Sequence, residues 1–220
     1  MKLNQKNRPI LMHWLEYIDN YIKTNMMNKR FIILSFLISL VTFQVKAYDF
    51  YVSNTDGVRI YYDFQSGSGN KVIVVEGSQM YKGIVNIPDS VLYDGTVYAV
   101  ETIGMRAFAF CSQLTGVTMP PKLKTIRESA FAQCPKLTDI VLPDELTEIR
   151  ERAFEQCIAL ETVSFGSNLT TIGQYAFYGC TALESLDLGS KVAEIEYAAF
   201  CICSSLKKSP YRKALQKSVM

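Results

Sequence analysis

IRERAFEQCIALETVSFGSNLTT, residues 149–171, is one copy of a 23-residue unit that decides the fold. Four copies are complete and a fifth is incomplete, and they begin at Ile103, Ile126, Ile149, Ile172 and Ile195. Isoleucine, Ala-Phe, cysteine and leucine recur without drift; in this copy they are Ile149, Ala153, Phe154, Cys157 and Leu160. A fixed period in the twenties is typical of a solenoid, in which each unit buries its apolar face only against its neighbours. We therefore expect the five units to stack.

The first half of each unit predicts a short helix. Ala107, Phe108 and Cys111 stand at i, i+1 and i+4, which places them on one helical face. After it, Leu114, Val117 and Met119 end in a two-residue alternation, which is strand periodicity. Aligned units would join these strands into a parallel sheet. A second apolar pair, such as Leu123 and Ile126, is expected only to close the turn before the next helix.

The full pattern I-x-x-x-A-F-x-x-C-x-x-L-x-x-V-x-L-P over residues 103–206 resembles the BspA-type leucine-rich repeat of bacterial surface proteins. The DG-x-x-Y and G-x-x-x-IP phrases ahead of the repeats are also similar to that family's N-terminal part. The resemblance implies an α/β solenoid with parallel strands on the concave face and short helices on the convex face. It also implies an exported or cell-surface protein, often linked to adhesion to host proteins or other cells.

Residues 48–102 read as a small antiparallel β unit that caps the open end of the repeats. Hairpin signals lie at Asp56-Gly57 and Asp94-Gly95, each between aromatic and β-branched residues. The tyrosines of this unit favour cross-strand packing, although a sugar-stacking platform is an alternative. They are Tyr51, Tyr61, Tyr62, Tyr81, Tyr93 and Tyr98.

Residues 26–47 have the layout of a secretory signal peptide: Lys29 and Arg30, an apolar run from Phe31 to Val45, and a small residue at Ala47. The run is shorter than the roughly 20 residues that span a bilayer, so cleavage is expected rather than a retained anchor. Residues 1–25 do not fit ahead of such a signal, which indicates a start placed too far upstream; an extended cytosolic segment is the alternative.

Charge argues against a nucleic-acid partner. The net charge of +2 comes from residues 1–47, which hold seven basic and two acidic residues. From Tyr48 onward 16 basic residues face 19 acidic ones, so the folding part is mildly acidic. A membrane is expected to matter only through export or surface attachment.

The C-terminal residues 207–220 depart from the repeat. After Leu206 the strand pattern is replaced by Lys207-Lys208-Ser209-Pro210. The tail is expected to be irregular, and it could be an atypical cap or the mark of a truncated adhesin that is inert by itself.

The cysteines form a row, one in each unit, which is expected to face inward as small apolar filler. Disulfides between neighbouring units are the alternative for an exported protein, but five thiols cannot all pair. The row is Cys111, Cys134, Cys157, Cys180 and Cys203. Cys201 is out of register and is the thiol we expect to face outward.

Catalysis is not expected. The only histidine is His13, so triads that need a histidine are excluded beyond residue 47. The carboxylates of Glu128, Glu151 and Glu155 fall on variable positions and are better explained as solvated surface than as a glycosidase pair. The cysteines lack the paired spacing of zinc knuckles. We predict no cofactor and no metal.

A binding face is predicted on the concave side, from strand side chains that point away from the core. These positions are small, mostly uncharged and variable between units: Thr118, Asp139, Val141, Thr162, Ser164, Ser185 and Asp187. The sequence thus predicts a secreted or surface-displayed, non-catalytic binding protein that adheres to host matrix or cell-surface proteins. Glycan capture for nutrient uptake is the alternative.

Overall fold

The computed structural model describes residues 48–67 and 69–207. The described residues all belong to one compact unit, Ala47–Met220. The expectations for the upstream start, the signal peptide and residues 208–220 of the tail lie outside the described residues. No helix within the described ranges is long and apolar enough to cross a membrane.

The N-terminal part forms two hairpins where the turn signals predict them. β1 pairs antiparallel with β2 around Asp56-Gly57, and β5 pairs antiparallel with β6 around Asp94-Gly95. β2 also pairs antiparallel with β3, but β3 pairs parallel with β6. The purely antiparallel unit expected here is therefore wrong: the sheet is mixed. Its strands are β1 (Phe50–Ser53), β2 (Arg59–Phe64), β3 (Lys71–Val75), β5 (Ser90–Tyr93) and β6 (Thr96–Ile103).

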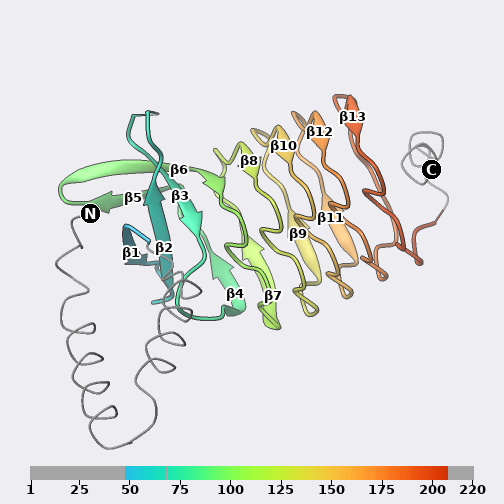
Figure 1. The fold of residues 1–220 in the computed structure, drawn as a ribbon, viewed down its shortest axis with the longest axis horizontal. Coiled ribbons are helices and arrows are strands. Elements are labelled where there is room, and N and C mark those ends of the chain that lie inside the picture. The colour runs from blue at the N-terminus through green and yellow to red at the C-terminus, as the bar shows by residue number, and fades with distance from the viewer. Residues whose placement is uncertain (1–47, 68, 208–220) are drawn as a thin grey trace, which may run out of the picture. The chain divides into compact units, whose positions relative to one another are not determined.

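This mixed sheet continues without a break into the repeats (Figure 1). The order is β1-β2-β3-β6-β8-β10-β12-β13, and the pairs from β6 onward are parallel. Each short strand contains the isoleucine that begins a unit, together with the residue before it. The sequence assigned these residues to a closing turn, so this second ladder was missed. Its members are β8 (Thr125–Ile126), β10 (Glu148–Ile149), β12 (Thr171–Ile172) and β13 (Glu194–Ile195).

The predicted strand rhythm forms strands apart from that sheet, in two separate two-stranded sheets. β9 pairs parallel with β11, and β4 pairs parallel with β7. The fourth strand expected around Leu186 does not form a ladder, although Leu186 and Leu188 are buried. The strands are β4 (Lys82–Asn86), β7 (Gln113–Thr118), β9 (Asp139–Val141) and β11 (Thr162–Ser164). β4 occupies the same place in the N-terminal part as β7 does in the first unit, because Val85 pairs with Val117 in register.

The helices expected on the convex side are wrong: residues 48–67 and 69–207 contain no helix. Each Ala-Phe-x-x-Cys stretch is a turn segment in which two residues take positive φ, for example Arg106 (56°) and Phe110 (62°). Left-handed residues end a right-handed helix. The N–H groups of Arg106, Phe108 and Phe110 instead donate to carbonyl oxygens of the next unit, at 2.8–3.1 Å.

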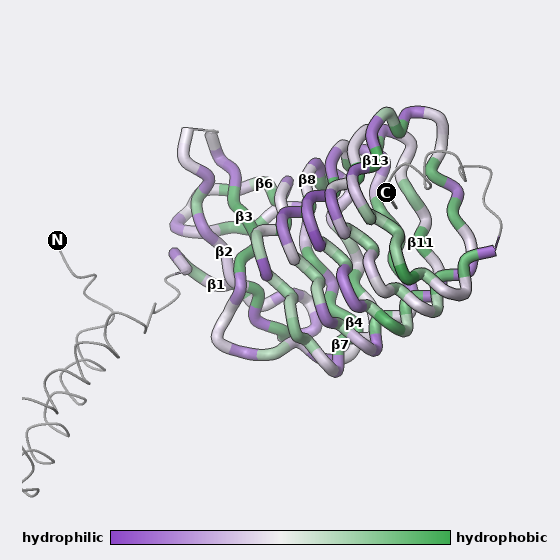
Figure 2. Tube along the Cα trace, turned by 45° about the vertical axis from the view of Figure 1, so that its right-hand side comes forward, coloured by the Kyte–Doolittle hydropathy of each residue, from purple (hydrophilic) through white to green (hydrophobic). Residues whose placement is uncertain are grey.

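The inward positions of the units form one continuous core. The phenylalanines stack in a column from Phe108 to Phe200, with neighbouring ring centroids 5.0–5.2 Å apart and planes within 8° of parallel. Tyr81 of the N-terminal part extends this column, 4.6 Å from Phe108. Hydrophobic and hydrophilic stretches recur in step from unit to unit (Figure 2). Burial of this recurring apolar face holds the units together.

Candidate binding surface

Every residue of the predicted binding face is exposed in the structure. The strand face, which we define as the outward side of β4, β7, β9 and β11, carries five of them between buried neighbours such as Ile140 and Val163. Ser185 and Asp187 lie in the following unit, on a stretch that forms no strand. Alternation along a strand sends successive side chains to opposite sides. The exposed residues are Thr118, Asp139, Val141, Thr162, Ser164, Ser185 and Asp187.

Parallel pairing places these side chains in rows across the units. Asp139 is the register partner of Thr162, and Val141 of Ser164. The Thr162 hydroxyl donates to Asp139 Oδ1 at 2.5 Å. This bond, with a second from Thr138, lowers the pKa of Asp139 below its usual value. The carboxylate is therefore held ionised and oriented within its row.

β4 adds two residues to the strand face that the sequence did not single out. Asn86 accepts a hydrogen bond from the Thr118 hydroxyl at 2.6 Å. Ile84 is 65% exposed and pairs with Gly116 in the next strand. The phrase Ile84-Val85-Asn86-Ile87-Pro88 follows the V-x-L-P rhythm of the repeats, and this signal could have found them. The face thus combines polar rows with two exposed apolar side chains, Ile84 and Val141.

The cysteine row lies where a ladder of inward thiols is expected. Cys111, Cys134, Cys157 and Cys180 are buried, Cys203 is partly buried, and all five are free. The Cys134 and Cys157 thiols donate to the Phe108 and Phe131 carbonyl oxygens of the preceding unit, both at 3.1 Å. Cys180 and Cys203 repeat this contact at 3.2 Å.

Burial raises the pKa of the Cys111, Cys134, Cys180 and Cys203 thiols and so keeps them protonated. It raises the pKa of Cys111 to about 11 and that of Cys203 to about 12. The neighbouring Cys157 thiol and burial raise the pKa of Cys134 as well. A thiol that stays protonated at neutral pH is a poor nucleophile and a poor metal ligand. The row is therefore suited to packing. Cys201, expected to face outward, is half-buried and also free.

The tyrosines of the N-terminal part do not form the platform that glycan stacking requires. Tyr61, Tyr62 and Tyr81 are at most 2% exposed, and Tyr98 is half-buried. Tyr62 pairs across the strands with Phe50, whose ring lies 5.5 Å away. Cross-strand packing accounts for these rings.

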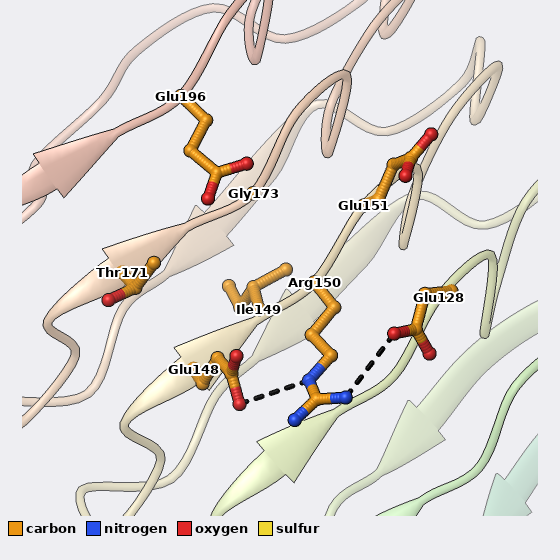
Figure 3. Close-up of a pocket in the computed structure, with 8 residues that line it drawn as sticks. All are labelled: Glu128, Glu148, Ile149, Arg150, Glu151, Thr171, Gly173 and Glu196. Carbon is orange, nitrogen blue, oxygen red and sulfur yellow. Dashed lines mark hydrogen bonds and ion pairs between the residues drawn. The ribbon is translucent and has the colours of Figure 1, made fainter.

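An open, acidic groove lies along the second ladder, beside β10 and β12 (Figure 3). Arg150 stands at its centre, with Nη1 3.3 Å from Glu128 and Nε 3.1 Å from Glu148. The sequence treated the acidic positions as separate solvated residues, whereas the stacked units bring them together. The lining residues are Glu128, Glu148, Ile149, Arg150, Glu151, Thr171, Gly173 and Glu196. Within the described part of the chain, no group of three or more His, Cys, Asp or Glu side chains is arranged to hold a metal ion.

Comparison with known proteins agrees with this geometry. The family model for the BspA type leucine-rich repeat region matches residues 82–208 in six copies. It begins at β4, ahead of the first complete unit. No curated protein matches the chain.

Solved structures of bacterial leucine-rich repeat proteins have a similar fold. One from Bacteroides ovatus has 32% identity and a TM-score of 0.66, over 74% of this chain and 41% of its own. One from Treponema pallidum has 30% identity and a TM-score of 0.59, over 75% of this chain and 69% of its own. The pneumococcal vaccine antigen PcpA, at 18% identity and a TM-score of 0.52 over 74% of this chain and 50% of its own, shares the fold alone. This chain therefore spans less than half the length of the Bacteroides ovatus protein.

Proposed function

Because this chain belongs to the BspA-type leucine-rich repeat family, we propose that it is a non-catalytic binding protein displayed at or secreted from the cell surface. Its partner on this proposal is a protein of a host matrix or of a neighbouring cell, and the strand face makes the contact. Members of the family are often linked to adhesion.

The arrangement of the strand face carries the proposal. Its side chains are small, stand in register between β9 and β11 and between β4 and β7, and include the polar rows of Asp139-Thr162 and Thr118-Asn86. Rows that are already hydrogen-bonded lose little conformational entropy on binding. Exposed Ile84 and Val141, which is 67% exposed, supply apolar area for a protein partner.

The experiment is a binding screen of the full chain against immobilised fibronectin, laminin and collagen, followed by variants of the strand face. Ser164→Arg places a long charged side chain in the middle of the rows, and we expect it to weaken binding about tenfold or more. Ser66→Arg, the same change in an exposed turn after β2, is the matched control and should bind within about twofold of the original chain.

Two outcomes would contradict the proposal. Equal weakening by Ser164→Arg and Ser66→Arg would show that the strand face is not the contact. Capture of oligosaccharides on a glycan array, with no retention of any protein, would favour the alternative of a glycan-binding accessory protein.

A further inference from the structure

Three tyrosines gather on the surface of the turn segments, away from the strand face. The Tyr175 ring lies 5.6 Å from the Tyr178 ring and 5.6 Å from the Tyr197 ring, at interplanar angles of 84° and 89°. The Arg152 guanidinium carbon lies 5.3 Å from the centre of the Tyr175 ring. We call these four residues the tyrosine cluster.

Stacking of the units brings together residues from three successive units that are far apart in the sequence. Tyr175 and Arg152 occupy the same position in neighbouring units, 23 residues apart, and Tyr197 belongs to the next unit again. The Tyr175 N–H donates to the Tyr197 carbonyl oxygen at 3.1 Å, which fixes their spacing. The four earlier units hold Met105, Glu128, Glu151 and Gln174 where Tyr197 stands.

The rings are not used by the core. Among the described residues, the buried cluster that holds the units together contains Phe177 and Phe200 beneath this surface but none of the three tyrosines. Tyr197 is 46% exposed, and Tyr175 and Tyr178 are half-buried. Tyrosine and arginine are enriched among the residues that dominate protein interfaces. An exposed group of both is therefore available for a partner.

Ring geometry favours a cation over a flat ligand. The Tyr178 and Tyr197 rings are each nearly perpendicular to the Tyr175 ring, so their faces point in other directions than its face, as in the aromatic cages that hold ammonium groups. Arg152 already occupies one face of Tyr175. A sugar ring, by contrast, stacks on one broad face, which perpendicular rings do not share.

The charge around the tyrosine cluster is negative, which is complementary to a cation. Arg152 is neutralised by Glu151 at 3.1 Å and Glu155 at 3.8 Å. Glu151 and Glu196 also line the acidic groove, in which they come from the third and the fifth unit (Figure 3). Across the cluster and groove, two guanidinium groups, Arg150 and Arg152, face five carboxylates: Glu128, Glu148, Glu151, Glu155 and Glu196. The surface therefore attracts positive charge.

We propose that the tyrosine cluster is a docking surface for a basic polypeptide segment. Lysine or arginine side chains of the partner lie against the Tyr178 and Tyr197 rings, while neighbouring positive charges follow the acidic groove. This surface is separate from the strand face, so the proposal stands or falls independently of the proposed function.

The test is fluorescence anisotropy of the full chain with a labelled decapeptide of alternating arginine and glycine. The matching glutamate-glycine peptide and maltohexaose serve as the other probes. We expect binding of the arginine peptide alone, weakening as salt rises. A Tyr178→Leu/Tyr197→Leu variant keeps apolar volume but removes the ring faces, and it should bind at least about tenfold more weakly. Tyr175→Phe keeps its ring and should bind within about twofold of the original chain.

The N-terminal part offers a matched control. Tyr51 is 47% exposed and carries Arg59 at 5.0 Å from its ring centre, but its tyrosine neighbour, Tyr61 at 5.8 Å between ring centroids, is only 2% exposed and offers no face to a ligand. Tyr51→Leu should leave binding unchanged. Undiminished binding by the double variant, equal loss in Tyr51→Leu, or preference for maltohexaose would each overturn the proposal. Thermal unfolding of the double variant should match that of the original chain, since its rings lie outside the core.

Discussion

Tyr62 places a hydroxyl group in the core where it has no hydrogen-bond partner among the described residues. The side chain is fully buried, and desolvation raises the pKa of its phenol well above the usual value. A buried hydroxyl without a partner costs about 1–3 kcal/mol. Its neighbour Tyr61 differs, because its hydroxyl pairs with that of Ser78 at 2.9 Å. Removing the hydroxyl group should therefore change the free energy of unfolding in opposite directions at these two adjacent tyrosines.

We predict that Tyr62→Phe raises the free energy of unfolding by about 1 kcal/mol, because the ring stays and the unpaired hydroxyl is removed. Tyr61→Phe removes a formed hydrogen bond and should lower the free energy of unfolding by about 0.5–1 kcal/mol. Equilibrium urea unfolding of the full chain measures both. A loss of stability in Tyr62→Phe would show that its hydroxyl has a partner.

The space for side chains in β7, and in the loop after β11, depends on how closely neighbouring units approach. Gly166 follows β11 and is buried; a Cβ atom there would lie 2.1 Å from the Pro143 carbonyl oxygen of the preceding unit. Gly116 lies within β7, and a Cβ atom there would lie 3.5 Å from the Ile84 side chain. The first distance is a clash with backbone, and the second is ordinary contact.

Gly166→Ala is therefore expected to lower the free energy of unfolding by about 2–3 kcal/mol, because backbone must move apart. Gly116→Ala adds a Cβ atom that makes only ordinary contact with Ile84. It should change the free energy of unfolding by less than about 0.5 kcal/mol. Urea unfolding and the yield of folded protein compare the two. Similar effects would mean that the units can separate after the strands at little cost.

The sequence was enough to predict that the units stack, that the Leu-x-x-Val-x-Leu stretches form strands, and which strand residues are exposed. Each of these predictions depends on a pattern within one unit. Sequence reasoning failed at the turn segment. The i, i+1, i+4 spacing of Ala107, Phe108 and Cys111 points three side chains inward in a helix and in this turn alike. The bonds that decide between them, such as Phe108 N–H to the Ala130 carbonyl, join different units. Glycine would have signalled a left-handed residue within the turn segment, but among the five copies only the fourth has one there, Gly179.

The tyrosine cluster and the acidic groove were missed for the same reason. Tyr175, Tyr197 and Arg152 stand in three different units, and their contacts follow from the pitch between units rather than from spacing along the chain. The seven exposed residues could be named because alternation of apolar and polar residues is visible in each copy, and five of them lie on β7, β9 and β11. Which partner that face contacts stays a prediction.

The column of phenylalanines runs through all five units and meets Tyr81 of the N-terminal part. In a repeat protein each unit contacts only its neighbours, so stability is a sum of unit and interface contributions. Phe154 has a stacked ring on both sides, at 5.2 and 5.0 Å. For Phe200 only one stacked neighbour, Phe177 at 5.1 Å, lies within the described residues. Position along the column should therefore decide the cost of removing a ring.

We predict that Phe154→Ala lowers the free energy of unfolding by about 3–5 kcal/mol, since it opens a cavity between two interfaces. Phe200→Ala should cost about 1–3 kcal/mol, because one interface is lost and the surroundings can collapse. Hydrogen exchange locates the damage: Phe200→Ala should expose amides of residues 195–207 alone, whereas Phe154→Ala should expose amides on both sides of its unit. Equal costs, or exchange that spreads from Phe200 to the N-terminal strands, would show that the whole chain unfolds as one body and that the units have no separate stability.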